Sequence, residues 1–206
     1  MADDSADDAA EVAVPNLGDA LPLVASDPRW LEVALDDLDA IHADHLHCER
    51  KAAQSALSLI RSYPEQTDLV AAMARLAHDE TRHVVQVAQL MTRRGQAASY
   101  DHGDTYAKAL RDHIRTREPE RLLDRLLVFA VIEARSAERL GLLAGALAEP
   151  KTRALYASLA IAEVRHRDIF LSLARAMSTT WRDRAAELAA IETQIMATHP
   201  IAARIH

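Results

Sequence analysis

Residues 69–91, LVAAMARLAHDETRHVVQVAQLM, constrain how the rest of the chain can fold. Read as a helix, the stretch has one face whose positions alternate by four and three residues, the register of a helix packed in a bundle. This face consists of Leu69, Met73, Leu76, Glu80, His83, Val87 and Leu90. Glu80 and His83 thus occupy positions where apolar side chains belong. An unpaired buried carboxylate costs several kcal/mol, so other segments must supply partners for both residues.

The composition favours helix almost throughout a single domain. The chain has 206 residues, of which 50% are hydrophobic and only 4% aromatic, with five glycines and seven prolines. Ala, Leu, Arg and Glu dominate, and these are strong helix formers. Cys48 is the single cysteine, so no internal disulfide can form, which suits a reducing cytoplasm. We therefore expect an all-α, cytoplasmic protein.

The charge is concentrated at the N-terminus. Residues 1–20 contain six acidic side chains and no basic one, and we expect them to form an acidic, flexible arm preceding a helical domain over 21–206. The other 186 residues carry 24 basic and 25 acidic side chains, a balance that neither requires nor excludes a polyanionic partner. The sequence has no run of eighteen apolar residues and no basic-then-apolar leader, so neither a membrane span nor a secretory signal is expected.

Apolar periodicity and helix-stop signals predict four long helices and two shorter ones. The expected helices span 28–62, 67–94, a short segment near 104–115, a helix opened by Pro119, a helix after the Glu149-Pro150 break, and 181–198. The core-facing positions of the other three long helices also contain polar residues: Glu49 in the first, Glu133 in the third, and Glu163 with His166 in the fourth.

The spacing of these polar residues repeats. Glu49 precedes Glu80 by 31 residues, and Glu133 precedes Glu163 by 30. The midpoint of each pair falls on a predicted turn, so each antiparallel hairpin sets one glutamate beside a Glu-x-x-His pair, about 22 Å from the turn. Packing the two hairpins face to face brings four carboxylates and two imidazoles to one level.

Such a cluster predicts a dinuclear metal centre. Four carboxylates balance two divalent cations, and mixed oxygen and nitrogen donors favour iron or manganese over a thiolate-bound metal. The arrangement is that of ferritin-like di-iron and di-manganese proteins: a four-helix bundle with one long crossover, here the 53 residues from Glu80 to Glu133, plus flanking helices. A metal-free ion-pair network would need core-facing Arg or Lys, and the four faces contain none.

Longer strings resemble one family of this superfamily. They are residues 44–53 (DHLHCERKAA), 57–60 (LSLI), 86–95 (QVAQLMTRRG) and 117–138 (REPERLLDRLLVFAVIEARSAE). Together they resemble the tRNA hydroxylases that act on 2-methylthio-N6-isopentenyladenosine beside the anticodon, over about residues 23–195. The resemblance implies an O2-dependent di-iron monooxygenase that hydroxylates the isopentenyl group, with tRNA as substrate and an external electron donor as partner.

The resemblance also implies roles for individual residues. The metal ligands would be Glu49, Glu80, His83, Glu133, Glu163 and His166. Among them, Glu80 and Glu163 would bridge the metals, whereas Glu49 and Glu133 would bind terminally.

Other polar residues have two interpretations each. His45 and His42 precede Glu49 by one and two turns, and they are either outer-shell or channel groups or ordinary hydrogen-bonded core histidines. A tRNA partner requires cations, and the candidates are Arg93, Arg94, Arg111, Arg115, Arg117, Arg121 and Arg125. Acidic residues are interleaved with them, so these arginines could also form an ordinary solvated face.

Two other functional classes fit the same helices. A ferritin- or rubrerythrin-like protein would oxidise iron or scavenge peroxide without RNA, and would assemble into a cage if it stored iron. A non-catalytic helical interaction module would bind no metal. The hydroxylase interpretation instead predicts a monomer or dimer.

Overall fold

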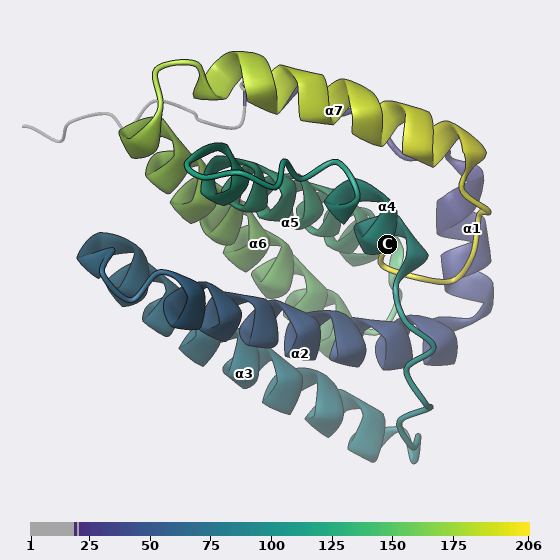
Figure 1. The fold of residues 1–206 in the computed structure, drawn as a ribbon. Helices are drawn as coiled ribbons and strands as arrows, with labels where there is room; N and C mark the ends of the chain where they lie inside the picture. The colour runs from purple at the N-terminus through teal and green to yellow at the C-terminus, as the bar shows by residue number, and fades with distance from the viewer. Residues whose placement is uncertain (1–18, 20) are drawn as a thin grey trace, which may run out of the picture.

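The computed structural model describes residue 19 and residues 21–206, which form α-helices and no strands in that part of the chain (Figure 1). The predicted acidic arm, Asp19 apart, lies outside the described residues. The helices are α1 (Arg29–Asp36), α2 (Leu38–Ser62), α3 (Thr67–Arg93), α4 (Thr105–Arg111), α5 (Glu120–Ala146), α6 (Pro150–Met177) and α7 (Trp181–Thr198). None of these helices is long and apolar enough to cross a bilayer.

Two antiparallel hairpins form the bundle. α2 pairs with α3 and α5 pairs with α6, while α7 lies over α5 and α4 along the top of the view (Figure 1). The crossover from α3 to α5 contains α4. This is the predicted ferritin-like architecture, and the predicted bounds of α7 match the structure.

The first predicted helix is wrong in one respect, because it is two helices rather than one. Asp37 leaves the helical conformation, with φ −135° and ψ 68°, and its side chain accepts a hydrogen bond from the Ala40 N–H at 3.0 Å. An N-cap of this kind satisfies a backbone donor at the start of α2. α1 can therefore turn aside, and Trp30 is buried with the Arg139 guanidinium 4.6 Å from its ring centre. The short helix predicted at 104–115 also ends earlier, at Arg111.

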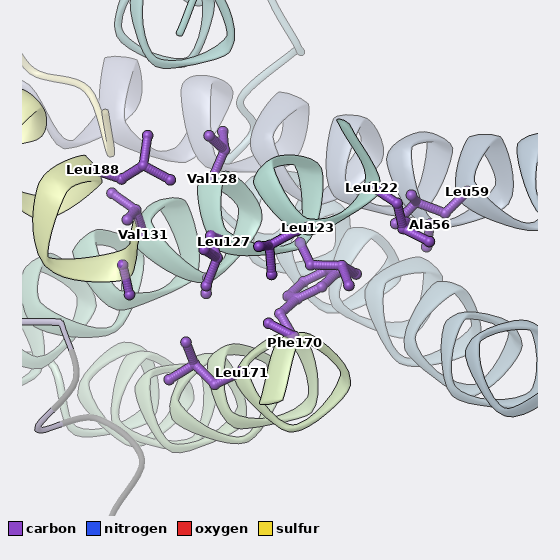
Figure 2. Packing of buried hydrophobic residues seen from close by; sticks show 14 of the residues in the cluster. Ala56, Leu59, Leu122, Leu123, Leu127, Val128, Val131, Phe170, Leu171 and Leu188 are labelled. Atoms are coloured by element: carbon purple, nitrogen blue, oxygen red, sulfur yellow. The ribbon is translucent and has the colours of Figure 1, made fainter. Parts of the chain in front are cut away.

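The apolar core consists of two clusters at opposite ends of the bundle. One cluster, shown in part in Figure 2, joins the C-terminal half of α2 and the N-terminal half of α5, and includes Leu59, Leu127 and Phe170. The other joins the N-terminal half of α2 and the C-terminal half of α5, and includes Ile41 and Leu143. The two hairpin turns therefore lie at opposite ends of the bundle. The layer between the two clusters contains the core-facing glutamates and histidines that the sequence singled out.

Candidate metal centre

The six predicted ligands meet in the layer between the two apolar clusters. They are Glu49 on α2, Glu80 and His83 on α3, Glu133 on α5, and Glu163 and His166 on α6. All six are buried, with at most 5% of each residue exposed. The helix-face and spacing argument therefore located the layer correctly.

The two Glu-x-x-His pairs face each other across the hairpins. One ligand atom from each of Glu80, His83, Glu163 and His166 lies within 4.8 Å of the other three. His166 Nδ1 is 2.9 Å from Glu80 Oε1 and 3.2 Å from Glu163 Oε2. In the same way, His83 Nδ1 is 3.3 Å from Glu80 Oε2 and 3.7 Å from Glu163 Oε1. Each imidazole thus contacts a carboxylate from both hairpins.

The two remaining glutamates flank this group. Glu49 Oε2 is 3.5 Å from His83 Nδ1. Glu133 lines a cavity together with Glu49 and Glu163. Burial, followed by repulsion from Glu163, raises the pKa of Glu133 well above its ordinary value. The side chains therefore form a continuous layer of four carboxylates and two imidazoles.

Crowding of like charges perturbs the protonation of the layer. Burial, with repulsion from Glu163 and Glu49, raises the pKa of Glu80 to about 8. Burial alone would lower the pKa of both histidines, but the adjacent carboxylates outweigh it and raise the pKa of His83 and of His166 to about 10. Protons on these groups offset the negative charge of the glutamates. Metal binding displaces protons from its ligands, and the layer has such protons to release.

The donor set fits a pair of divalent cations. Glu80 Oε1 and Glu163 Oε1 are buried without a hydrogen-bond partner, although Glu80 Oε1 lies close to His166 outside hydrogen-bonding geometry. Within the described residues, only histidines form ion pairs with the six-residue layer. Carboxylate oxygens with two imidazole nitrogens suit iron or manganese. The buried Glu/His cluster is therefore compatible with a di-iron site.

The two upstream histidines differ in their contacts. His45 Nε2 donates to Glu49 Oε1 at 2.6 Å, so His45 directly orients a predicted ligand. His42 Nδ1 instead lies 3.2 Å from Gln96 Oε1, and burial lowers the pKa of His42. His45 therefore has the contact expected of an outer-shell group, whereas the polar contact of His42 is with Gln96.

A small cavity of about 50 Å³ opens beside the layer. Glu49, Glu133 and Glu163 line one side of it. The rest of the lining includes Ala52, Phe129, Ile132, Ser136, Leu140, Ile205 and His206. Lys51 and Arg111 also line it, as well as an adjoining surface pocket that contains Arg125. The cavity thus lies between the acidic layer and a pocket whose lining includes Lys51, Arg111 and Arg125.

The predicted tRNA-binding arginines do not form one group. Arg111 and Arg125 line the adjoining pocket, and Arg125 also stacks 5.6 Å from the Tyr63 ring centre. Arg115 forms an ion pair with Asp124, with Nη2 2.7 Å from Oδ1.

The other four predicted arginines are exposed. They are Arg117 and Arg121, and Arg93 and Arg94 at the end of α3. The sequence argument omitted Lys51, for which the helix pattern gave no signal.

A second buried polar network, beneath α7, was also not predicted. Arg135 Nη2 lies 2.7 Å from Glu192 Oε1, and both residues are almost fully buried. Tyr106 Oη donates to the same oxygen at 3.1 Å, and Arg135 also contacts Glu138. Arg135 follows Glu133 by two residues and so lies on a different face of α5. The predicted core-facing positions did not include that face.

Comparison of the sequence with known proteins identifies the family. The family model described as tRNA-(MS[2]IO[6]A)-hydroxylase (MiaE) matches residues 19–206. A Pseudomonas putida protein named tRNA 2-(methylsulfanyl)-N(6)-isopentenyladenosine(37) hydroxylase is 44% identical over 145 residues, which covers 70% of each chain. A Salmonella typhimurium protein of the same name is 32% identical over 198 residues, covering 72% of this chain and 73% of that protein.

A solved structure has the same architecture. It is titled protein 43 with aldehyde deformylating oxygenase activity, from Synechococcus, and it superposes with a TM-score of 0.84 at 34% identity. The match covers 89% of this chain and 94% of that one. By the family match over residues 19–206 and by both relatives, the chain belongs to the MiaE family of tRNA hydroxylases.

Proposed function

We propose that this protein is an O2-dependent di-iron monooxygenase. Its substrate would be 2-methylthio-N6-isopentenyladenosine beside the tRNA anticodon, and it would hydroxylate the isopentenyl group. The observation that carries the proposal is the buried layer of four glutamates and two histidines beside a cavity, in a member of this hydroxylase family. The ferritin-like alternative, iron oxidation or peroxide scavenging without RNA, is not favoured by the named relatives.

Six side chains would hold the metal pair: Glu49, Glu80, His83, Glu133, Glu163 and His166. Glu80 and Glu163 are the proposed bridging ligands, since their carboxylates lie between the two histidines. Two bound irons would supply the redox chemistry by which O2, two electrons and two protons convert a C–H bond to C–OH and water. The electrons would come from an external one-electron carrier or flavin reductant. Manganese is the alternative metal.

The surrounding residues would orient the ligands and exclude water. His45 fixes the Glu49 carboxylate through the 2.6 Å hydrogen bond, and such supporting contacts tune metal affinity. The two apolar clusters seal the layer on both sides. Exclusion of water limits unproductive side reactions at the centre.

The isopentenyl group would enter through the cavity. A water molecule needs roughly 10–15 Å³, so the cavity of about 50 Å³ has room for a few waters, and a five-carbon chain requires it to widen. Phe129, Ile132 and Leu140 offer apolar contacts to that chain. The base itself would leave the anticodon stack, as enzymes that modify buried bases require.

A direct assay tests this function. Purified protein loaded with about two irons per chain should, with reductant and O2, hydroxylate modified tRNA from a strain that lacks the hydroxylase. Nucleoside mass spectrometry should show a gain of one oxygen atom, labelled when 18O2 is supplied. A cage-sized particle by light scattering, combined with iron oxidation but no modified nucleoside, would instead support iron storage.

Charge reversal at the cavity mouth should weaken tRNA binding. In Arg111→Glu and Arg125→Glu, the loss of a phosphate contact should lower the slope of log affinity against log salt by about 1, with iron content unchanged. Fluorescence anisotropy over a salt series measures the affinity for tRNA and its slope with salt, and metal analysis measures the iron content. Arg153→Glu, an exposed position in the first turn of α6, is the matched control. An equal loss in the control would mean that net charge, not this surface, binds the RNA.

A further inference from the structure

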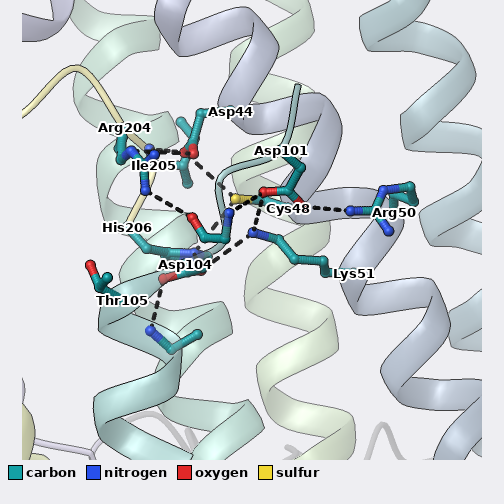
Figure 3. Close-up of polar contacts among 12 residues, drawn as sticks. Asp44, Cys48, Arg50, Lys51, Asp101, Asp104, Thr105, Arg204, Ile205 and His206 are labelled. Carbon is teal, nitrogen blue, oxygen red and sulfur yellow. Dashed lines mark hydrogen bonds and ion pairs between the residues drawn. The ribbon is translucent and has the colours of Figure 1, made fainter. Parts of the chain in front are cut away.

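Three side chains near the cavity form a continuous hydrogen-bonded chain. His206 Nδ1 lies 3.2 Å from Asp104 Oδ2, and His206 Nε2 lies 2.7 Å from Ser136 Oγ. Figure 3 shows His206 close to Asp104 and to Cys48, whose Sγ lies 3.6 Å from the same Nδ1 atom. Because the two ring nitrogens contact different partners, the imidazole connects a carboxylate on one side to a hydroxyl on the other.

Neighbouring contacts fix this chain in place. Asp104 Oδ1 caps α4 by accepting from the Ala107 N–H at 2.8 Å. The His206 ring stacks on Tyr106, with centres 5.4 Å apart and planes inclined by 18°. Burial opposes ionisation of Asp104, but His206, the Ala107 N–H and Lys51 together hold its pKa well below the ordinary value. Asp104 is therefore a carboxylate that accepts from the His206 Nδ1–H.

The hydroxyl end of the chain reaches the reaction site. Ser136 lies one helical turn after Glu133 on α5, and both line the cavity with Glu163. His206 lines the same cavity. In the tRNA complex the modified base would occupy the mouth, so bulk water could no longer deliver protons from that side.

We propose that Ser136, His206 and Asp104 deliver a proton to the reaction, a role that rests on the proposed hydroxylase function. Hydroxylation with O2 consumes two protons for each water released; this hydrogen-bonded chain supplies one, and the other would be taken up from solvent before the base closes the mouth. The His206 imidazolium passes its Nε2 proton to Ser136 Oγ as the Ser136 hydroxyl releases its own proton into the cavity. Neutral His206 then keeps the proton on Nδ1, where it is hydrogen-bonded to Asp104. When the product leaves and the mouth reopens, Nε2 takes up a new proton from solvent. Imidazole suits this task because it has two ring nitrogens, so it can release a proton at one while it keeps a proton at the other.

A cation site is the competing interpretation of the same residues. Cys48, Asp104 and His206 each place a ligand atom within 4.8 Å of the other two. However, Lys51 Nζ lies 3.8 Å from Asp104 Oδ2, and an ammonium group there repels a metal cation. The position of the Lys51 ammonium group therefore favours proton transfer over metal binding.

Kinetic measurements on three variants test the proposal. Ser136→Ala and His206→Gln should each lower the hydroxylated product formed per O2 consumed by about tenfold or more, with a changed solvent deuterium isotope effect. Ser136→Thr keeps the hydroxyl and should retain most of the coupling. Ser158→Ala, which removes an exposed hydroxyl on α6 outside the cavity lining, is the matched control. Iron content should stay at the wild-type value in all four variants.

A second measurement does not depend on turnover. In the iron-free protein, 15N NMR of histidine-labelled chains should show the His206 Nε2 resonance shifting in Ser136→Ala while Nδ1 is unchanged, and the reverse in Asp104→Asn. His206→Gln identifies the resonances. Unchanged coupling, isotope effect and Nε2 resonance in Ser136→Ala would overturn the proton-transfer role, as would a third metal ion per chain that is lost in His206→Gln. An inactive wild-type enzyme with the expected NMR response would instead refute the hydroxylase function.

Discussion

Glu80→Ala is expected to abolish both metal binding and hydroxylation. Glu80 contacts both histidines of the layer, with His166 Nδ1 2.9 Å and His83 Nδ1 3.3 Å from its oxygens. Without this carboxylate, neither proposed metal position keeps its full set of donors. The iron content should therefore fall from about two to below about one per chain, and product formation should fall to the level of iron-free enzyme. Metal analysis and nucleoside mass spectrometry measure the two effects.

The adjacent residue provides the control for this variant. Asp79 is also a carboxylate on α3, but its side chain is 40% exposed and pairs with Arg82. Asp79→Ala should retain iron and activity. Retention of both irons in Glu80→Ala would show that Glu80 is not a ligand.

Thermal melting separates metal binding from folding in the same two variants. Ligands that bind only the folded state raise its stability, so ferrous iron under anaerobic conditions should raise the melting temperature of the wild type and of Asp79→Ala. It should not do so for Glu80→Ala. Without iron, Glu80→Ala removes a buried group whose pKa is raised to about 8 by burial and by like charges. The iron-free variant should therefore melt no lower than the iron-free wild type.

Arg135→Met should have the largest effect on stability away from the metal layer. The substitution leaves Glu192, which is fully buried, with only Tyr106 as a hydrogen-bond donor, and Glu192 Oε2 already lacks a partner. Removing one member of a buried ion pair costs about 3–5 kcal/mol. For a chain of this length, the melting temperature should fall by roughly 6–20 °C, as measured by circular dichroism.

An exposed arginine on the same helix serves as the comparison. Arg121→Met should change stability by no more than about 0.5 kcal/mol, since Arg121 is exposed near the start of α5. If Arg135→Met has the same melting temperature as Arg121→Met, then protonation or hydration of Glu192 compensates for the lost arginine, and the predicted loss of stability is wrong. The double variant Arg135→Met/Glu192→Leu should recover part of the loss, because it removes the remaining buried charge.

Apolar periodicity was sufficient to predict the layer. A polar residue at a core-facing position requires a compensating partner, and equal distances from a turn determine which residues become neighbours. Both rules depend only on helix geometry, so they identified Glu49 and Glu133 as neighbours of the two Glu-x-x-His pairs without any tertiary information. The substrate did not follow from these rules. It depended on the longer strings, because ferritin-like bundles support many chemistries.

The missed features depend on contacts between distant segments. Asp37 reads as an ordinary helical residue, whereas the break there accompanies the burial of Trp30 beside Arg139, which is 109 positions further along the chain. Arg135 and Glu192 are 57 residues apart, and neither has a periodic pattern that predicts the pairing. Contacts of His206 with Asp104 and Ser136 likewise join segments that no local spacing relates.

The opposed hairpin turns have a consequence for how the protein matures. Each hairpin carries one carboxylate and one Glu-x-x-His pair, and each histidine contacts a carboxylate of the other hairpin. The segment from α3 to α5 must run the length of the bundle before the two halves meet. A newly made chain thus has no complete set of donors until its topology is finished, so a pair of metal ions would be bound by folded molecules and not by partly folded ones.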